Sequence, residues 1–346
     1  MGEKIKEESF YVPLDITAAI NEHDQLVQTG ETCRVEALKN QFAWMRGHVN
    51  GWYGWGGDGK STMLDFLSVL KVKYDNWKVC MYKPENMDTV MKNGKPQIKA
   101  NRIYKNLAWT INGKTWNKNF SIKHKSAIMS FEEEQEALKV ISKNVFIIYP
   151  KDRSIASLMK SFRFMYDTYG IDIFVLDPWN VVQTGDEDGF TKDEQLSNVF
   201  HQIKEFAMET NSIFNIVSHP KSMTEQRETK AKNSPFKVVN PYMILGGSAW
   251  DMKMDGQFSV YQPDRHLWPR GTKVELHTFK VKDSEIAGYE WGMVQFDFDK
   301  LRRQYYFGNL YPMSGELRED AKKQSEINFS KPFERAVPKD EDSMPF

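Results

Sequence analysis

Cysteines, long apolar runs and net charge are scarce or absent in this sequence of 346 residues. The two cysteines, Cys33 and Cys80, are too few for a disulfide framework or a cysteine zinc site, and they favour a reducing, cytoplasmic setting. No apolar run approaches the ~18 residues of a membrane-spanning helix, and we expect no membrane association. The 47 basic and 47 acidic residues cancel, so any binding of nucleic acid must depend on local patches.

A phosphate-binding loop is the strongest motif. The segment Gly54–Ser61 reads Gly-Trp-Gly-Gly-Asp-Gly-Lys-Ser and matches G-x-x-x-x-G-K-[ST] at every fixed position. Glycines let consecutive N–H groups point at phosphate oxygens, the lysine reaches the β and γ oxygens, and the serine hydroxyl ligates Mg²⁺. A short strand at Gly51–Tyr53 and a helical pattern over Ser61–Lys73 flank it. The predicted ATP-binding residues are Gly54, Gly56, Gly57, Asp58, Gly59, Lys60, Ser61 and Thr62.

A second nucleotide signal is an apolar run that ends in a carboxylate, Ile171–Asp177. A central strand of this kind delivers Asp177 to the edge of a sheet beside the phosphate loop, where a carboxylate holds the Mg²⁺ shell through water. Taken alone, the run also fits a strand followed by an Asp-Pro turn. Two strand candidates separate it from the phosphate loop, and this spacing favours the metal role for Asp177, together with Ser61.

Two more polar residues follow predicted strands. Glu85 comes after Lys78–Tyr82, and ATP hydrolysis needs a carboxylate that orients the attacking water while Asp177 serves the metal. His219 closes Ile213–Ser218, a position from which a side chain can sense the γ-phosphate. We therefore predict Glu85 as the catalytic base and His219 as a sensor; for Glu85, an exposed loop glutamate is the alternative that the local sequence leaves open.

Alternating strands and helices predict an α/β fold, with a mostly parallel sheet flanked by helices and antiparallel strands toward the C terminus. Helices are predicted over Ile155–Tyr169 and Leu196–Thr210, and a helical pattern also runs through Val35, Leu38, Phe42 and Met45. The predicted strands are Lys78–Tyr82, Val145–Tyr149, Ile171–Asp177, Ile213–Ser218, Gln257–Tyr261, Lys273–Phe279 and Gln295–Asp299. We divide the chain into an N-terminal extension (1–29), an ATPase domain (30–312) and a polar, disordered tail (313–346).

The order of these motifs, continued by Gly246–Trp250 through Asp255 and by Thr278–Lys282, resembles the RecA-type ATPase domain of hexameric replicative helicases. Within that group it is similar to the Twinkle-like and phage branch of the DnaB family, over roughly residues 30–308. The resemblance implies a RecA-like P-loop NTPase core in a homo-oligomeric ring, usually a hexamer. Such a ring encircles single-stranded DNA, moves 5′ to 3′ and binds ATP between neighbouring subunits.

The resemblance also implies roles for single residues. Carried over by position, Lys60 and Ser61 bind phosphate and Mg²⁺, Glu85 is the catalytic base, Asp177 is the Walker B acid and His219 is the γ-phosphate sensor. A phage protein of this kind would work in the host cytoplasm. Only about fifty residues precede the phosphate loop, so we expect a minimal motor without a primase portion or a collar.

One departure from the family concerns the cation that reaches across the subunit interface. The family has Lys-x-Arg at a late strand, and this chain has Lys280-Val281-Lys282. Lysine supplies the charge without the bidentate fork of arginine. Either Lys282 is a weaker finger, or hydrolysis is slow, or the cation comes from elsewhere, for instance Arg302 or Arg303.

The predicted DNA contacts lie in a basic segment, 220–239. A segment of this charge neutralises phosphates without reading sequence. The acidic segment 185–189 would instead repel them. The predicted DNA-binding residues are Lys221, Arg227, Lys230, Lys232 and Lys237.

The acidic end of the chain, 340–346, resembles the tip of bacterial single-stranded-DNA-binding proteins. It predicts docking onto replication partners, with a solubilising terminus as the alternative. Two functions remain open for the whole chain: a helicase motor, or a RecA-like ATPase that binds single-stranded DNA and loads, anneals or regulates without unwinding.

Overall fold

A computed structural model describes residues 16–17, 30–92, 95–150, 152–184, 191–221, 228, 234–267 and 271–318. The acidic segment 185–189 and the acidic tip 340–346 lie outside these residues, as do Arg227, Lys230 and Lys232, and the expectations for all of them stay predictions. Within the described part, no helix combines the length and the apolar character that crossing a membrane requires.

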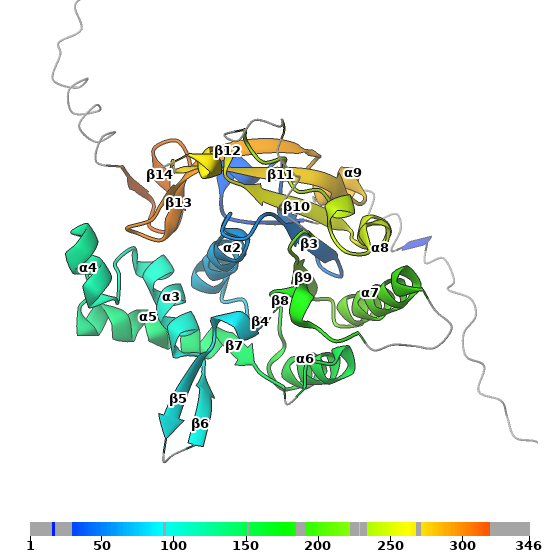
Figure 1. Ribbon diagram of the computed structural model, residues 1–346, viewed down its shortest axis with the longest axis horizontal. Helices are drawn as coiled ribbons and strands as arrows, with labels where there is room; N and C mark the ends of the chain where they lie inside the picture. Colours follow the sequence, from blue (N-terminus) through cyan, green and yellow to red (C-terminus); the bar gives the residue numbers. More distant parts are fainter. Residues whose placement is uncertain are drawn as a thin grey trace, which may run out of the picture.

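The core is a nine-stranded sheet in the order β13-β12-β11-β10-β3-β9-β8-β4-β7 (Figure 1). Six neighbouring strands, from β10 to β7, are parallel, and the last three are antiparallel. The predicted α/β class is therefore confirmed. The parallel strands are β3 (Val49–Tyr53), β4 (Val79–Tyr82), β7 (Val145–Ile148), β8 (Ile173–Leu176), β9 (Ile213–Val217) and β10 (Gly256–Tyr261), and the antiparallel ones are β11 (Lys273–Val281), β12 (Gly292–Asp299) and β13 (Gln304–Tyr306).

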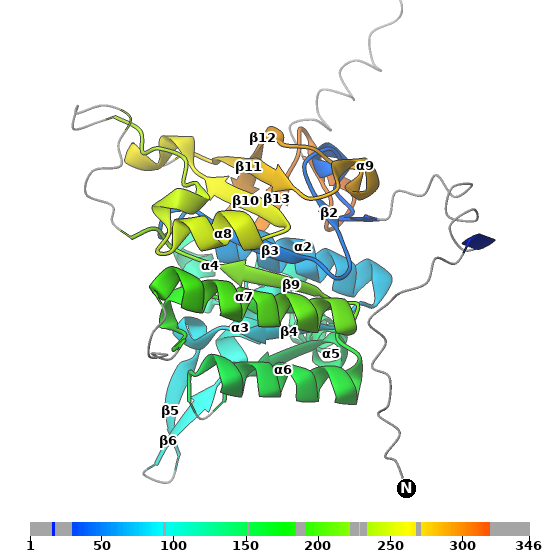
Figure 2. The ribbon, with the colours of Figure 1, turned by 90° about the vertical axis from the view of Figure 1, so that its right-hand side faces the viewer.

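Helices cover both faces of the sheet (Figures 1 and 2). One face carries α2 (Lys60–Asp75), α3 (Asn101–Asn112) and α5 (Phe131–Asn144), and the other carries α6 (Ile155–Tyr169), α7 (Lys192–Glu209) and α8 (Gly247–Lys253). Each face has its own apolar core. A sheet covered on both sides needs strands that are apolar throughout, and all residues of β4, β8 and β9 are buried.

Local sequence sets where the helices begin and end. Ser130 and Glu133 form a capping box at the start of α5, and Thr191 and Glu194 form another at the start of α7. Gly170 ends α6 in a left-handed conformation. The chain also forms two short helices, α4 (Lys118–His124) and α9 (Ser284–Ala287).

The N-terminal lead-in is folded, although its predicted helix is wrong. The structure has β1 (Glu31–Thr32), a 3₁₀ turn η1 (Glu36–Leu38) and β2 (Ala43–Trp44) where the apolar spacing predicted helical turns. All four residues of the pattern are buried. The apolar spacing therefore predicted the buried residues correctly and the backbone conformation wrongly, because an irregular segment can bury the same residues.

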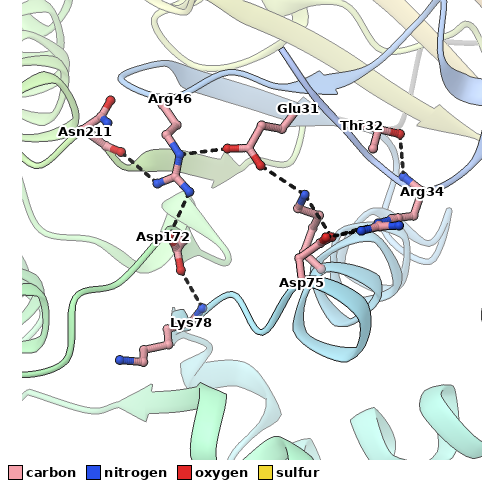
Figure 3. A network of polar contacts seen from close by, with 9 residues as sticks. Glu31, Thr32, Arg34, Arg46, Asp75, Lys78, Asp172 and Asn211 are labelled. Carbon is pink, nitrogen blue, oxygen red and sulfur yellow. Dashed lines mark hydrogen bonds and ion pairs between the residues drawn. The ribbon is translucent and has the colours of Figure 1, made fainter. Parts of the chain in front are cut away.

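A network of charges fastens this lead-in to the sheet (Figure 3). Arg46 binds Glu31 (Nε to Oε1, 2.9 Å) and Asp172 (Nη2 to Oδ1, 3.0 Å). The buried Lys71 of α2 lies 3.4 Å from Glu31 Oε2 and 3.1 Å from Asp75 Oδ2. Asp172 comes directly before β8, so the network lies at the amino edge of the parallel strands and leaves the other edge free for chemistry.

Two small hairpins stand apart from the main sheet. Strands β5 (Asp88–Lys92) and β6 (Lys95–Lys99) project away from the body of the protein (Figure 2). Strands β14 (Leu310–Tyr311) and β15 (Glu316–Leu317) pair near the end of the described chain. Residues 313–318, which the sequence assigned to the tail, thus belong to the described fold, and Met313 is buried.

Candidate functional site

The candidate site lies at the carboxyl edge of the parallel strands. Strands β3, β9, β8 and β4 are neighbours, so the segments that follow them meet at one edge. The phosphate loop follows β3, His219 follows β9, Asp177 follows β8, and Glu85 follows β4. They surround a cavity of about 190 Å³, lined by Ser61, Thr62, Asp65, Lys83, Glu85, Asn86, Ile103, Asn106, Asp177, His219 and Arg303.

The phosphate loop curls tightly into the start of α2. A Cβ at Gly54 would lie 2.4 Å from the carbonyl oxygen of Val260, so only glycine fits there. Gly59 caps the 16-residue helix with φ 95°, which favours glycine. This leaves a backbone cradle at a helix N-terminus, the arrangement that binds phosphate. The residues present therefore fit a nucleotide.

Lys60 is held inside the loop. Its Nζ donates to the carbonyl oxygens of Gly54 (2.8 Å) and Trp55 (3.0 Å). Burial lowers the pKa of Lys60 to about 8, against the opposing effect of Asp177 and Asp58. A phosphate in the cradle would place a negative charge beside this buried ammonium and stabilise its charged form.

Asp58 braces the loop from within. Its Oδ2 accepts from the N–H of Trp55 (3.2 Å), and its own N–H donates to the Trp55 carbonyl (3.1 Å). Arg265, from the turn after β10, donates to Asp58 Oδ1 at 2.6 Å; the Asp58 side chain is fully buried and that of Arg265 is 9% exposed. Burial raises the pKa of Asp58 to about 6, although Arg265 works against the rise. A direct contact of Asp58 with a nucleotide stays a prediction.

A buried triad joins Asp177 to α2. Lys83, directly after β4, is 1% exposed and lies between Asp65 and Asp177. Its Nζ bonds Asp65 Oδ1 and lies 3.3 Å from Asp177 Oδ2, at ion-pair distance but without hydrogen-bond geometry. Burial lowers the pKa of Lys83, but the two neighbouring carboxylates raise it by more, so the net shift of the pKa is upward. Among the described residues, no group donates a hydrogen bond to this buried Asp177 oxygen, which suits a hydrated cation held with Ser61.

Glu85 and His219 lie on either side of Asp177 along the edge. Glu85 is exposed, in the 3₁₀ turn η2 (Pro84–Asn86) at the mouth of the cavity. The backbone N–H of His219 donates to Asn180 Oδ1 (3.0 Å). Burial lowers the pKa of His219 to about 4, and the charge of Lys60 lowers it further. The ring is therefore neutral at pH 7, with one nitrogen that can donate to a phosphate oxygen.

Lys282 does not reach this cavity. It follows β11, its N–H donates to the Asp255 carbonyl (2.9 Å), and its Nζ lies 3.7 Å from Asp255 Oδ1. Asp255 also accepts from the N–H of Val49 (2.8 Å), the first residue of β3. Lys282 therefore lies at the amino edge, the whole length of β3 away from the phosphate loop, with 51% of its side chain exposed.

The two alternatives to Lys282 differ from each other. Arg302 is engaged by Glu316, with Nη1 to Oε2 at 2.8 Å, and it lies over the ring of Tyr311. Arg303 lines the cavity of its own chain. Neither observation tests a contact with a neighbouring subunit, so both alternatives stay predictions.

Two of the predicted DNA-binding lysines are described, and both are exposed. Lys221 comes just after His219, and its N–H donates to the Met243 carbonyl (3.1 Å). The carbonyl of Lys237 accepts from Trp55 Nε1 in the phosphate loop (2.9 Å). The Lys237 end of the basic segment 220–239 thus contacts the phosphate loop, and the Lys221 end follows His219 in the chain.

A second cavity, of about 700 Å³, opens beside the phosphate loop. Gly57 and Thr62 form its loop side, and aromatic rings from three other elements form much of the rest. The lining residues are Gly57, Thr62, Trp109, Phe120, Gln262, Gly271, Thr272, Phe298, Lys300 and Arg303. A flat aromatic base, whose faces can stack on such rings, fits a cavity of this lining and size.

Sequence reasoning missed Lys83, Asp65, Arg265 and Asn180. Three of them share a signal with the residues that it found: Lys83, Asn180 and Arg265 follow the carboxyl ends of β4, β8 and β10. Asp65 had no such signal, because it lies within α2 and its role depends on Lys83.

The sheet order, the phosphate loop and the carboxylate after β8 define a RecA-like P-loop NTPase core. A solved structure described as an ATPase domain has the same fold, with a TM-score of 0.63 and 15% sequence identity, over 84% of this chain and 95% of that one. A structure described as a DnaB-like replicative helicase and its interactions with primase also matches, with a TM-score of 0.63 and 16% identity, over 85% of this chain and 67% of that one. No family model and no curated protein matches the sequence.

Proposed function

We propose that this chain is an ATP-driven helicase or translocase motor that acts on single-stranded DNA in replication. The observation that carries the proposal is the meeting of phosphate loop, Asp177, Glu85 and His219 around one cavity. Fold similarity to a DnaB-like replicative helicase supports the same function.

Hydrolysis follows from the positions of these groups. A water oxygen forms a bond to the γ-phosphorus while the bond from that phosphorus to the bridging oxygen breaks, and its electron pair leaves on ADP. Glu85, at the mouth of the cavity, accepts the proton of the water and releases it to solvent. Lys60 neutralises the β and γ oxygens, and the neutral His219 donates to a γ oxygen until the phosphate departs.

Ser61 and Asp177 are the residues that would hold Mg²⁺. Serine hydroxyl and carboxylate oxygens are ligands that this ion accepts, and both side chains line the cavity. When bound, the ion offsets negative charge on the β and γ phosphates. Lys83 and Asp65 keep Asp177 in place from the protein side.

The base of ATP fits the 700 Å³ cavity, because Gly57 and Thr62 connect that cavity to the phosphate loop. Aromatic faces such as those of Trp109 and Phe298 stack on any base, so we expect weak discrimination among nucleotides.

DNA binding rests on the basic segment 220–239. Trp55 of the phosphate loop contacts the Lys237 carbonyl and packs on Phe236 with ring centroids 5.7 Å apart. His219 stands at the other end of the segment. A change in nucleotide state therefore reaches both ends of the proposed DNA-binding segment.

The ring is proposed from the position of Lys282. A cation at the amino edge is too far to serve its own phosphate loop and is exposed, as a residue acting on a neighbour's ATP must be. We further propose a hexamer, 5′ to 3′ movement, and docking of replication proteins on the acidic tip 340–346.

A non-unwinding ATPase that loads, anneals or regulates on single-stranded DNA is the second candidate. The observation in its favour is Lys282, a lysine where helicases of the DnaB type have arginine.

A forked DNA with a 5′ single-stranded tail separates the two. We expect the parent chain to separate the strands in the presence of ATP and Mg²⁺, and Lys60→Ala and Asp177→Ala to fail because they lose phosphate and metal contacts. DNA-stimulated hydrolysis without strand separation would decide for the second candidate.

A further inference from the structure

The turn between β12 and β13, residues 300–303, presents an arginine to the nucleotide site of its own chain. Arg303 lines both the 190 Å³ cavity, with Glu85 and Asp177, and the 700 Å³ cavity beside it. Its φ is 54°, in the left-handed region that side chains other than glycine rarely adopt. Surrounding contacts must hold such a conformation in place.

One set of these contacts holds the turn from its first half. Asp299 Oδ1 accepts from the N–H groups of Leu301 (2.8 Å) and Arg302 (3.1 Å). The indole of Trp109 donates to the Leu301 carbonyl (3.0 Å), which attaches the turn to α3.

A second set holds the residues that follow. Gln304 donates to the Thr110 carbonyl of α3 (2.8 Å), and both residues are buried. The hydroxyl of Tyr305 donates to the carbonyl of Gly59 in the phosphate loop (3.3 Å). The hydrogen bond from Tyr305 therefore fixes the turn relative to the phosphate loop. Arg303 is thus positioned relative to the bound phosphates before they arrive.

The charge of Arg303 is available to bind a ligand. It forms no ion pair with any described residue, whereas the adjacent Arg302 is engaged by Glu316. Asp65, a carboxylate on the same cavity, is already bound by Lys83. A half-buried, unpaired guanidinium beside a phosphate cradle gains most from a phosphate oxygen.

We propose that Arg303 binds the γ-phosphate oxygens of the ATP held by its own phosphate loop. It supplies in cis the planar fork that Lys282 lacks, and it stabilises the charge that spreads over the γ oxygens during transfer. This inference rests on the proposed ATPase function. Its consequence is that a subunit hydrolyses ATP at a basal rate without a finger from its neighbour.

The test compares Arg303→Ala and Arg303→Lys with Arg302→Ala, a matched control one residue away. ADP affinity is measured by calorimetry with and without aluminium fluoride, which mimics the transferring phosphoryl group. The readout is the ratio of ADP affinities with and without aluminium fluoride within each variant, so an effect of Arg303 on the base cavity that it also lines does not enter the comparison. Aluminium fluoride should tighten binding in the parent and in Arg302→Ala, and should fail to do so in Arg303→Ala. Hydrolysis should fall by about 10³-fold in Arg303→Ala and remain low in Arg303→Lys.

Mixing decides between cis and trans action. A mixture of Arg303→Ala and Lys60→Ala subunits should stay inactive, since no subunit then has an intact loop together with its own arginine. Recovered hydrolysis would overturn the cis assignment. Fluoride-dependent tightening and parental hydrolysis in Arg303→Ala would overturn the role itself. A parent chain that neither hydrolyses ATP nor responds to aluminium fluoride would instead refute the proposed function.

Discussion

At the residue scale, the site is built from charges that compensate one another across the strand ends. Lys83 lies between Asp65 and Asp177, and Arg265 holds Asp58. Each pair is buried, and breaking a buried pair leaves a charge without water or partner. The loop and the carboxylate after β8 are thus positioned before any ligand arrives.

The pair formed by Arg265 and Asp58 predicts a pH-dependent loss of stability. Burial raises the pKa of Asp58 to about 6, above its ordinary 3.8, so the stabilisation linked to its protonation is lost as the pH rises through 6. Arg265→Gln removes the cation that opposes this loss. We expect it to cost about 3 kcal/mol at pH 8 and clearly less at pH 5, in urea unfolding at the two pH values.

Asp58→Asn in the Arg265→Gln background is the control. It removes the titrating group, and the difference between pH 5 and pH 8 should disappear. An equal cost of Arg265→Gln at both pH values would show that the ionised Asp58 does not depend on Arg265.

Single residues were predictable where a motif or a strand end marked them. Lys60, Ser61, Asp177, Glu85 and His219 come from such positions, and the fold places all five at one edge. Pairing partners were not predictable, because Arg265 meets Asp58 across 207 positions of sequence.

At the scale of elements, strands were predictable for a physical reason. A parallel sheet covered on both faces requires continuous apolar runs, and each predicted run became a strand. The lead-in was predicted wrongly, since apolar spacing cannot separate a helix from an irregular segment that buries the same residues. The antiparallel pairing of β11 and β12 was predicted from short turns between apolar runs; the pairing is confirmed, but residues 282–291, which include α9, connect the two strands.

The lead-in should be as important to stability as the sheet that it covers. Phe42 packs its ring against those of Trp44, Trp52 and Phe258 at centroid distances of 4.8, 5.4 and 5.1 Å. Phe42→Ala should cost about 3 to 5 kcal/mol in the free energy of unfolding. Phe131→Ala is a control of equal chemistry on a residue that is 75% exposed, and it should change stability little. A small effect of Phe42→Ala would contradict the described packing.

At the scale of the whole molecule, the sheet separates two edges with different roles. The carboxyl edge carries the cavity proposed to bind nucleotide, and the amino edge carries Lys282 and the network around Arg46. A ring follows if the amino-edge cation of one subunit meets the carboxyl edge of the next. Such a contact could not be predicted from the sequence, because it forms between two subunits and not within one chain.

Mixed subunits test the ring. Lys282→Ala should lose at least ~10-fold of the DNA-stimulated hydrolysis rate, while Arg303 maintains a basal rate. Mixing Lys282→Ala with the inactive Lys60→Ala should restore part of the stimulation, because some interfaces then pair an intact loop with an intact Lys282. Lys282→Arg, with its planar fork, should equal or exceed the parent. If Lys282→Ala alone keeps the full DNA-stimulated hydrolysis rate, Lys282 is only a solvent-exposed residue after β11 and has no role at a neighbour's ATP.

The most direct test of the account is a comparison of ATP binding and ATP turnover in the parent and in Glu85→Gln, both with single-stranded DNA. The variant keeps the shape of the side chain and loses its basicity. We predict parental ATP affinity and a fall in turnover of ~10²-fold or more. Parental turnover in Glu85→Gln, or loss of ATP binding, would contradict the assignment of Glu85 as the catalytic base at the carboxyl edge.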